Sequence, residues 1–276
     1  MADTALIKWG KRFNQAYNYG SEITLDSHQV TFSSPMMPVG TTIKAWHSKG
    51  SYGEDRVAPL LPLLKPGKTY EVIFFIQENP KNQFRVDIDF RDQFGQITAT
   101  QYFEGLHFTF QYPHNAAHYS INLNNIKHET LVFYDILLIE KAEENSVRVE
   151  RGEELTFIKF QASSEKFQLL IHSSDRESIM VSDSTANLLL FVSRETNFQT
   201  VLSTIIDKLE TQGGHIEIKT GADVAKFSIE FQSLTEILQT YFPDKKIETD
   251  IKNTTDILTE YEIQMLLLAL QKQKGK

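Results

Sequence analysis

The chain has 276 residues, a formal net charge of −8 at neutral pH, 41% apolar residues and no cysteine. This length allows one large or two ordinary domains, and the apolar content is sufficient to fill their cores. The negative charge, without any basic cluster, argues against nucleic-acid binding, and the lack of cysteine excludes disulfides, thiolate metal sites and cysteine nucleophiles.

The N-terminal residues do not have the pattern of a secretory signal, which needs a positive segment followed by an apolar run. No apolar stretch approaches the roughly eighteen residues that a membrane span needs. The absence of cysteine fits a reducing compartment. We therefore expect a cytoplasmic protein that reaches a membrane only peripherally, at its inner face, or through a partner.

Short alternating strands separated by Gly, Pro, Asn and Asp occupy Ile23 to Glu140, with no amphipathic helix between them. The clearest strand, Phe84 to Phe90, has one apolar and one polar face. Tyr70 to Gln77 and Leu131 to Ile139 are apolar on both faces near their middles, as expected in a two-sheet sandwich. These patterns predict an all-β jelly roll or β-sandwich over residues 1–143.

The pattern changes after a charged stretch, residues 144–154, which is predicted to be a linker. In residues 155–276 short strands alternate with helices, and the clearest helix, Phe198 to Glu210, has a continuous apolar stripe. Further helices are predicted after the capping residues Ser233 and Thr259. The other predicted elements are strands at Phe157–Phe160, Phe167–Ile171, Ile179–Val181, Leu188–Val192, Ile216–Lys219, Phe227–Phe231 and Ile247–Ile251. The second domain is therefore predicted to be α+β or α/β.

An aromatic residue stands out in the predicted strand Thr42 to Ser48, where alternation places Trp46 on one face with Lys44 and Ser48. Aromatic rings stack on the apolar patches of sugars, while sugar hydroxyls need polar partners. Trp46 as part of the core or of a partner interface is an equal alternative. The candidate glycan-binding residues are Trp46, Tyr52, Arg56, Gln101, Tyr102 and Asn122.

Signatures of catalysis are weak. The chain lacks the phosphate-binding, dinucleotide-binding, serine-hydrolase and zinc-protease motifs. Asp87 and Asp89 could pair as glycosidase acid and base, but a solvated strand face explains them more simply. His114 and His118 lie between two strands, where four-residue spacing does not create a metal site, and Asp135 alone falls short of a calcium site. We predict a non-enzymatic protein without catalytic residues, metal or cofactor.

Several segments resemble known families. Two segments are similar to strands of jelly-roll carbohydrate-binding modules, namely Leu64-Lys-Pro-Gly-Lys-Thr-Tyr-Glu-Val-Ile-Phe-Phe-Ile and Phe133-Tyr-Asp-Ile-Leu-Leu-Ile-Glu140. A more specific series resembles the third accessory secretory protein of the accessory Sec system in streptococci and staphylococci, over about the first 140 residues. Its segments are Tyr19-Gly-Ser21, Met36-Met-Pro38, Ile43-Lys-Ala-Trp-His-Ser48 and Arg56-Val-Ala-Pro-Leu-Leu-Pro-Leu-Leu-Lys-Pro-Gly67.

This resemblance implies a non-enzymatic cytosolic factor that assembles with the first and second accessory secretory proteins. It also implies action with the accessory Sec motor ATPase in exporting a serine-rich repeat adhesin that already carries glycans. Under this hypothesis the sandwich engages the glycosylated adhesin and the second domain docks partner subunits. Two alternatives remain: a purely structural scaffold subunit without sugar binding, and a binding module of a carbohydrate-active enzyme.

Overall fold

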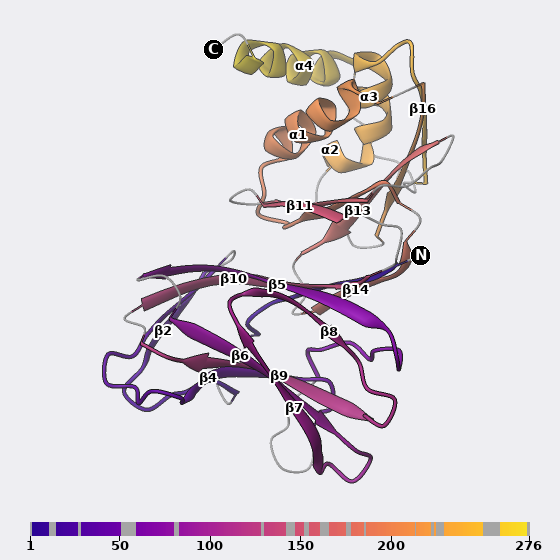
Figure 1. The fold of residues 1–276 in the computed structure, drawn as a ribbon. Coiled ribbons are helices and arrows are strands. Elements are labelled where there is room, and N and C mark those ends of the chain that lie inside the picture. The colour runs from indigo at the N-terminus through magenta and orange to yellow at the C-terminus, as the bar shows by residue number, and fades with distance from the viewer. Residues whose placement is uncertain are drawn as a thin grey trace. The chain divides into compact units, whose positions relative to one another are not determined.

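A computed structural model gives the structure of the chain, which divides into two compact units (Figure 1). The first unit comprises Met1–Glu143 and Arg176–Ser184, and the second comprises Glu144–Asp175 and Thr185–Lys276. The residues that the structure describes are 2–10, 15–26, 29–50, 59–79, 83–127, 130–141, 147–151, 155–160, 166–174, 178–184, 186–212, 214–221, 224, 229–250 and 260–274. The chain is mostly β, as its sequence predicts.

The larger sheet of the first unit has seven strands built around β10 (Thr130–Glu140). One edge of β10 pairs along its length with β5 (Thr69–Asn79), which also pairs with β8 (His107–Gln111). The other edge of β10 pairs with two strands in succession. These are β3 (Val30–Ser33), followed by β2 (Glu22–Leu25), and β1 (Ala2–Ile7), followed by β14 (Ser178–Ser184).

The smaller sheet of the first unit has four antiparallel strands. Their order is β4 (Thr42–His47), β9 (His118–Asn125), β6 (Phe84–Arg91) and β7 (Ile97–Glu104). In β6 buried and partly buried residues alternate strictly, so one face of this strand belongs to the core and the other faces outward.

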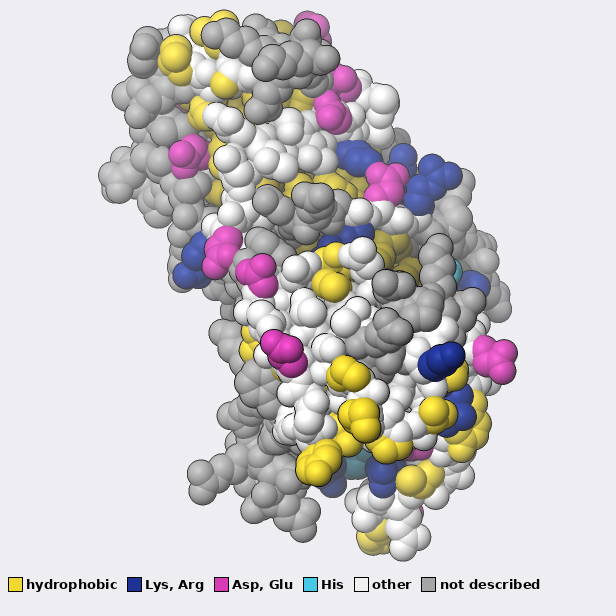
Figure 2. Space-filling view, turned by 90° about the vertical axis from the view of Figure 1, so that its left-hand side faces the viewer, with side chains coloured by type: hydrophobic (Ala, Val, Ile, Leu, Met, Phe, Trp, Pro, Cys, Tyr) yellow, Lys and Arg dark blue, Asp and Glu magenta, His cyan; other side chains and the backbone are white. Residues whose placement is uncertain are grey.

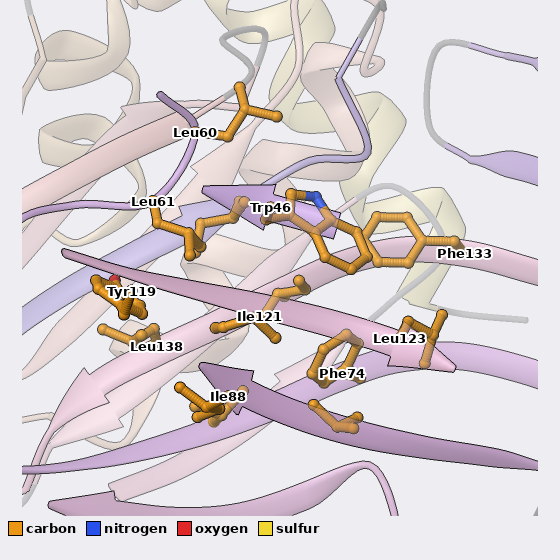
Figure 3. Packing of buried hydrophobic residues seen from close by; sticks show 14 of the residues in the cluster. Trp46, Leu60, Leu61, Phe74, Ile88, Tyr119, Ile121, Leu123, Phe133 and Leu138 are labelled. Carbon is orange, nitrogen blue, oxygen red and sulfur yellow. The ribbon is translucent and has the colours of Figure 1, made fainter. Parts of the chain in front are cut away.

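One hydrophobic core joins the two sheets (Figure 3). The ring of Trp46 from β4 stacks on that of Phe133 from β10, with centroids 5.5 Å apart, and meets the edge of Phe74 from β5 at 5.9 Å. Ile121 and Leu123 of β9 are fully buried in the same cluster. Because side chains from both sheets fill a single core, the first unit is a two-sheet sandwich.

The second unit contains a six-stranded sheet with helices against it. Its strand order is β11 (Val147–Arg151), β12 (Thr156–Phe160), β15 (Leu188–Val192), β13 (Phe167–Ser173), β16 (His215–Thr220) and β17 (Lys246–Thr249). Strands β15, β13, β16 and β17 are parallel. The helices are α1 (Phe198–Glu210), α2 (Ile229–Gln232), α3 (Leu234–Tyr241) and α4 (Glu260–Lys274), gathered on one side of this sheet in Figure 1.

Local sequence explains the start and the burial of α1. The Asn197 side chain caps the helix by accepting a hydrogen bond from the backbone N–H of Gln199 at 2.8 Å. Five apolar side chains at helical spacing are buried against the sheet, namely Val201, Leu202, Ile205, Ile206 and Leu209. The bounds of α1 match those predicted from this stripe.

Three elements differ from their predictions. The predicted linker contains β11, whose charged side chains suit the edge strand that it forms against β12. The strand near Ile179 belongs to the first unit, because β14 pairs with β1. Ile229–Gln232 forms the short helix α2, where the sequence predicts the end of a strand, Phe227–Phe231. Among the described residues, no helix has the length and apolar character required to span a membrane.

Candidate functional site

The outward face of the four-stranded sheet carries polar side chains that form hydrogen bonds and ion pairs with one another. Strand register places Asp87 between Tyr102 of β7 and Asn122 of β9, and places Asp89 between Thr100 and Ser120. Residues directly opposite each other on neighbouring strands have side chains close enough to interact. We call this surface the outer face.

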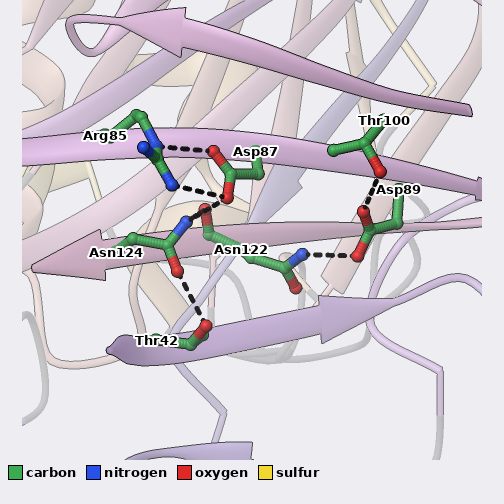
Figure 4. Close-up of polar contacts among 7 residues, drawn as sticks. All are labelled: Thr42, Arg85, Asp87, Asp89, Thr100, Asn122 and Asn124. Carbon is green, nitrogen blue, oxygen red and sulfur yellow. Dashed lines mark hydrogen bonds and ion pairs between the residues drawn. The ribbon is translucent and has the colours of Figure 1, made fainter. Parts of the chain in front are cut away.

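Asp87 is the centre of one group of contacts on the outer face (Figure 4). Arg85 Nε donates to Asp87 Oδ1 at 3.0 Å, and Asn124 Nδ2 donates to Asp87 Oδ2 at 2.7 Å. Thr42 Oγ1 in turn donates to Asn124 Oδ1 at 2.7 Å. The Asp87 carboxylate is only 14% exposed, so this group is firmly held.

Asp89 is the centre of a second group, one row further along the sheet (Figure 4). Its Oδ1 accepts from Thr100 Oγ1 at 2.7 Å and its Oδ2 accepts from Asn122 Nδ2 at 3.0 Å. The guanidinium of Arg91 lies 4.0 Å from the same carboxylate. Both carboxylates therefore accept hydrogen bonds from neighbouring side chains on the sheet surface. This structural role is the simpler explanation for the pair, the alternative being a glycosidase acid and base.

Tyr102 supplies an exposed aromatic ring to the outer face. Its side chain is 64% exposed, and the guanidinium of Arg85 lies 5.1 Å from the ring centroid. This cation–π contact fixes the ring beside Asp87 without covering it. Of the six candidate residues, Tyr102 and Asn122 are thus brought together, flanking the same carboxylate.

Trp46 was expected on a polar strand face, and the structure corrects this. The side chain is fully buried, and its Nε1 donates to the backbone carbonyl of Lys8 at 2.9 Å. The register of β4 against β9 shifts between Thr42 and Lys44, so the residues after this irregularity change faces. Lys44 and Ser48 share the face of Trp46, as predicted, but that face points into the sandwich.

The remaining glycan-binding candidates are not placed at this site by the structure. Gln101 precedes Tyr102 and lies opposite the buried Ile88, so it belongs to the inner side of the sheet. This separation could have been found in the sequence, because adjacent strand residues point to opposite faces. Tyr52 and Arg56 lie outside the described residues.

Other residues weighed as ligands have local roles. Asp135 is buried and forms an ion pair with Lys8 Nζ at 2.6 Å, so its carboxylate is already neutralised. His114 lies close above Gly67, whose positive φ of 76° makes a turn that suits glycine. Across the part of the chain that is described, no three His, Asp or Glu side chains form a group that could hold a metal ion.

Exposed apolar side chains also occur on the first unit. Figure 2 shows hydrophobic side chains gathered with lysine, arginine and histidine on its lower part. The most exposed large apolar residues of this unit are Tyr19, Met36, Val39, Leu63 and Phe94. The first unit thus combines an ordered polar sheet face with exposed apolar side chains.

The first unit is therefore a β-sandwich domain, and comparison with known proteins gives its family. A model of the family described as "Accessory Sec secretory system ASP3" matches residues 16–140. The accessory Sec system protein Asp3 of Streptococcus gordonii is 30% identical over 150 residues, which cover 51% of this chain and 94% of that protein. The chain belongs to this Asp3 family.

Two further matches differ in how much of the chain they cover. Asp3 of Staphylococcus aureus (strain NCTC 8325 / PS 47) is 28% identical over 137 residues, 50% of this chain. The match spans 43% of that relative's length. A chain of the Glycosylation Associate Protein (Gap123) complex from Streptococcus agalactiae shares the fold, with a TM-score of 0.51, 17% identity and coverage of 99% of this chain and 89% of that one.

Proposed function

We propose that this chain is a non-enzymatic subunit of an accessory secretion assembly that engages glycosylated serine-rich repeat adhesin during export. Its partners in this proposal are the first and second accessory secretory proteins and the accessory Sec motor ATPase, and its place is the cytoplasm, peripheral to the inner face of the membrane. Family membership carries the proposal, because the match covers most of the sandwich. The second unit would dock partner subunits.

The outer face supports a role in binding glycan. Tyr102 offers an exposed ring on which the apolar side of a sugar can stack. Asn122, on the other side of Asp87, has an amide that can both donate and accept hydrogen bonds. Arg85 contacts the Tyr102 ring and Asp89 accepts a hydrogen bond from the Asn122 amide, so both side chains are held in position, which lowers the cost of ordering them upon binding.

Binding of the purified full chain to glycosylated adhesin, compared with the same adhesin after enzymatic deglycosylation, tests this proposal. We expect Tyr102→Ala to weaken binding by roughly tenfold, equivalent to about 1.4 kcal/mol for one lost stacking contact. Asn122→Ala should weaken it by a smaller factor. Binding to a multi-repeat glycopolymer should be much tighter than binding to a monosaccharide, because several weak contacts act together.

Tyr19→Ala is the matched control, since Tyr19 is an exposed tyrosine of the same unit that belongs to none of the four strands of the outer face. Unchanged affinity in the Tyr102 variant, with Tyr19→Ala behaving alike, would remove the outer face from the proposal. Equal binding to glycosylated and deglycosylated adhesin would remove glycan recognition altogether.

A scaffold role for the sandwich is the second candidate, and one observation favours it. The carboxylates of Asp87 and Asp89 already accept hydrogen bonds from side chains of the same sheet. Such an internally satisfied surface can be covered by a partner subunit at little cost. Stable copurification with the first two accessory secretory proteins, together with no measurable glycan binding, would support this role over glycan recognition.

A further inference from the structure

A basic pocket lies at one end of the outer face, beyond the residues assigned to glycan recognition. Its volume is about 290 Å³, and its lining includes His47, Lys49, Arg91 and His118 together with Gly50 and Gly95. No aspartate or glutamate is among the described residues that line it. In a chain of net charge −8, a lysine and an arginine lining one pocket with two histidines is not a consequence of overall composition.

Three neighbouring strands of the same sheet position these groups. Arg91 of β6 lies directly opposite His118 of β9, and His47 of β4 lies opposite Ser120, one row away. The ladder continues past β4, because the backbone N–H of Ser48 donates to the carbonyl of Tyr119 at 3.0 Å. Regular sheet structure therefore fixes the backbone beneath the pocket.

Arg91 is held in place at the wall of the pocket. Its Nη1 donates to the carbonyl of Gly95 at 3.1 Å, and its Nη2 lies 4.0 Å from Asp89. Asp89 is the carboxylate nearest to this guanidinium in the contacts above, and it shares its oxygens with Thr100 and Asn122. A guanidinium with several donors and a fixed plane is well suited to bind a carboxylate or phosphate.

His118 adds an imidazole whose pKa depends on the charges around it. Burial, reinforced by the nearby Lys49 ammonium, lowers the pKa of His118 below its ordinary value. Its Nδ1 is buried without a hydrogen-bond partner. The charged groups around this ring are Lys49 and Arg91, with Asp89 behind Arg91 and the His47 imidazole also in the lining, so an added anion would offset the repulsion between the two cations.

We propose that this pocket binds a small oxyanion, a carboxylate or a phosphate group carried by a soluble ligand. The site is separate from Tyr102 and Asn122, so it stands or falls independently of the glycan recognition proposed above. Binding would raise the pKa of His118, because an anion close to the ring favours its charged form.

The test is titration of the full chain at low ionic strength with three probes: inorganic phosphate, glucuronate and glucose. Calorimetry gives the affinity, and the ring-proton resonances of His118 give its pKa by NMR. We expect saturable binding of phosphate or glucuronate, whichever of the two fits the pocket, with an upward shift in the pKa of His118. Glucose, which has no anionic group, should not bind there.

Variants localise the site. Arg91→Gln and Lys49→Gln should each weaken anion binding, the former by about tenfold or more because a charge-assisted hydrogen bond is lost. Lys127→Gln removes the same charge beyond the opposite end of β9 and should change affinity less than twofold. Lys49 is exposed, so its variant keeps the test valid if Arg91→Gln is poorly folded.

The proposal is overturned if neither phosphate nor glucuronate binds saturably, or if glucose binds as well as glucuronate. It is also overturned if Lys127→Gln weakens binding as much as Arg91→Gln, because the effect would then reflect net charge alone. Loss of anion binding with unchanged adhesin binding would confirm that the two surfaces are distinct.

Discussion

The two faces of the four-stranded sheet both carry polar residues, but these residues are accommodated in different ways. On the inner face, Lys44 is almost completely buried, with its Nζ 5.6 Å from the Trp9 ring centroid, and Trp46 donates to a backbone carbonyl. On the outer face, Asp87 and Asp89 lie in a network of neighbouring side chains.

This difference teaches that residue type does not identify the solvent face of a strand. A buried polar group is tolerated wherever a specific partner is provided, and the aromatic body of tryptophan suits a core. The partners of the inner groups come from distant segments of the chain, whereas those of the outer groups come from neighbouring strands. Perturbing each face should therefore have distinct effects on stability.

The largest expected effect is on the inner face. Trp46→Ala should lower the free energy of unfolding by about 3–5 kcal/mol, because it leaves a cavity where the ring packs on Phe74 and Phe133. Urea denaturation of the full chain measures this loss. Tyr102→Ala, an exposed aromatic on the opposite face, should change stability by no more than about 0.5 kcal/mol. Similar losses in both variants would contradict the contrast between the faces.

A smaller effect is expected from the outer network. Asp87→Ala should destabilise the chain by about 1–2 kcal/mol, because Arg85 and Asn124 lose a shared acceptor that is mostly shielded from water. Glu104→Ala removes the same charge from an exposed position opposite Arg85 and should cost about 0.5 kcal/mol at most. Denaturation curves for the pair measure the difference, and equal losses would show that charge rather than hydrogen bonding matters.

The smallest expected effect is on the pH dependence of stability, to which two adjacent residues of β9 contribute with opposite sign. Burial raises the pKa of Tyr119 well above its ordinary value, so its contribution is complete below about pH 10 and is lost as the unfolded chain ionises above that pH. Burial lowers the pKa of His118, so stability is lost instead as pH falls below about 6.5, where the unfolded chain takes up a proton first.

Thermal unfolding across pH checks both signs. Tyr119→Phe should flatten the alkaline side of the profile, at the cost of the hydrogen bond from its hydroxyl to the carbonyl of Pro62. His118→Gln should flatten the acidic side and leave the alkaline side unchanged. An acidic slope that persists in His118→Gln would assign that slope to other groups.

Sequence reasoning succeeded where a local pattern is sufficient. The stripe of α1 and the alternation of β6 each determine an element and its buried side, because neighbours in the chain supply the signal. It failed at β4, where one irregularity in register reverses the faces of every residue that follows. Nothing within Thr42 to Ser48 distinguishes this strand from a regular one.

The candidate site shows the same limit. The exposure of Tyr102 and the polar character of Asn122 follow from alternation, but their meeting at Asp87 depends on the pairing of β6 with both β7 and β9. Thr100 and Asn124 were not predicted, because their roles arise from this register alone. The pocket around Arg91 likewise combines residues from three strands that are distant in sequence.

The position of β14 has a consequence for how the protein is made. β1 leaves the ribosome well before its neighbour on one side, residues 178–184, which emerges only after β11, β12 and β13. Until then one edge of β1 offers unpaired backbone groups to any extended chain nearby. Translation that halts after Glu143 would leave that edge open, so completion of the sandwich has to wait for sequence that lies between two strands of the other unit.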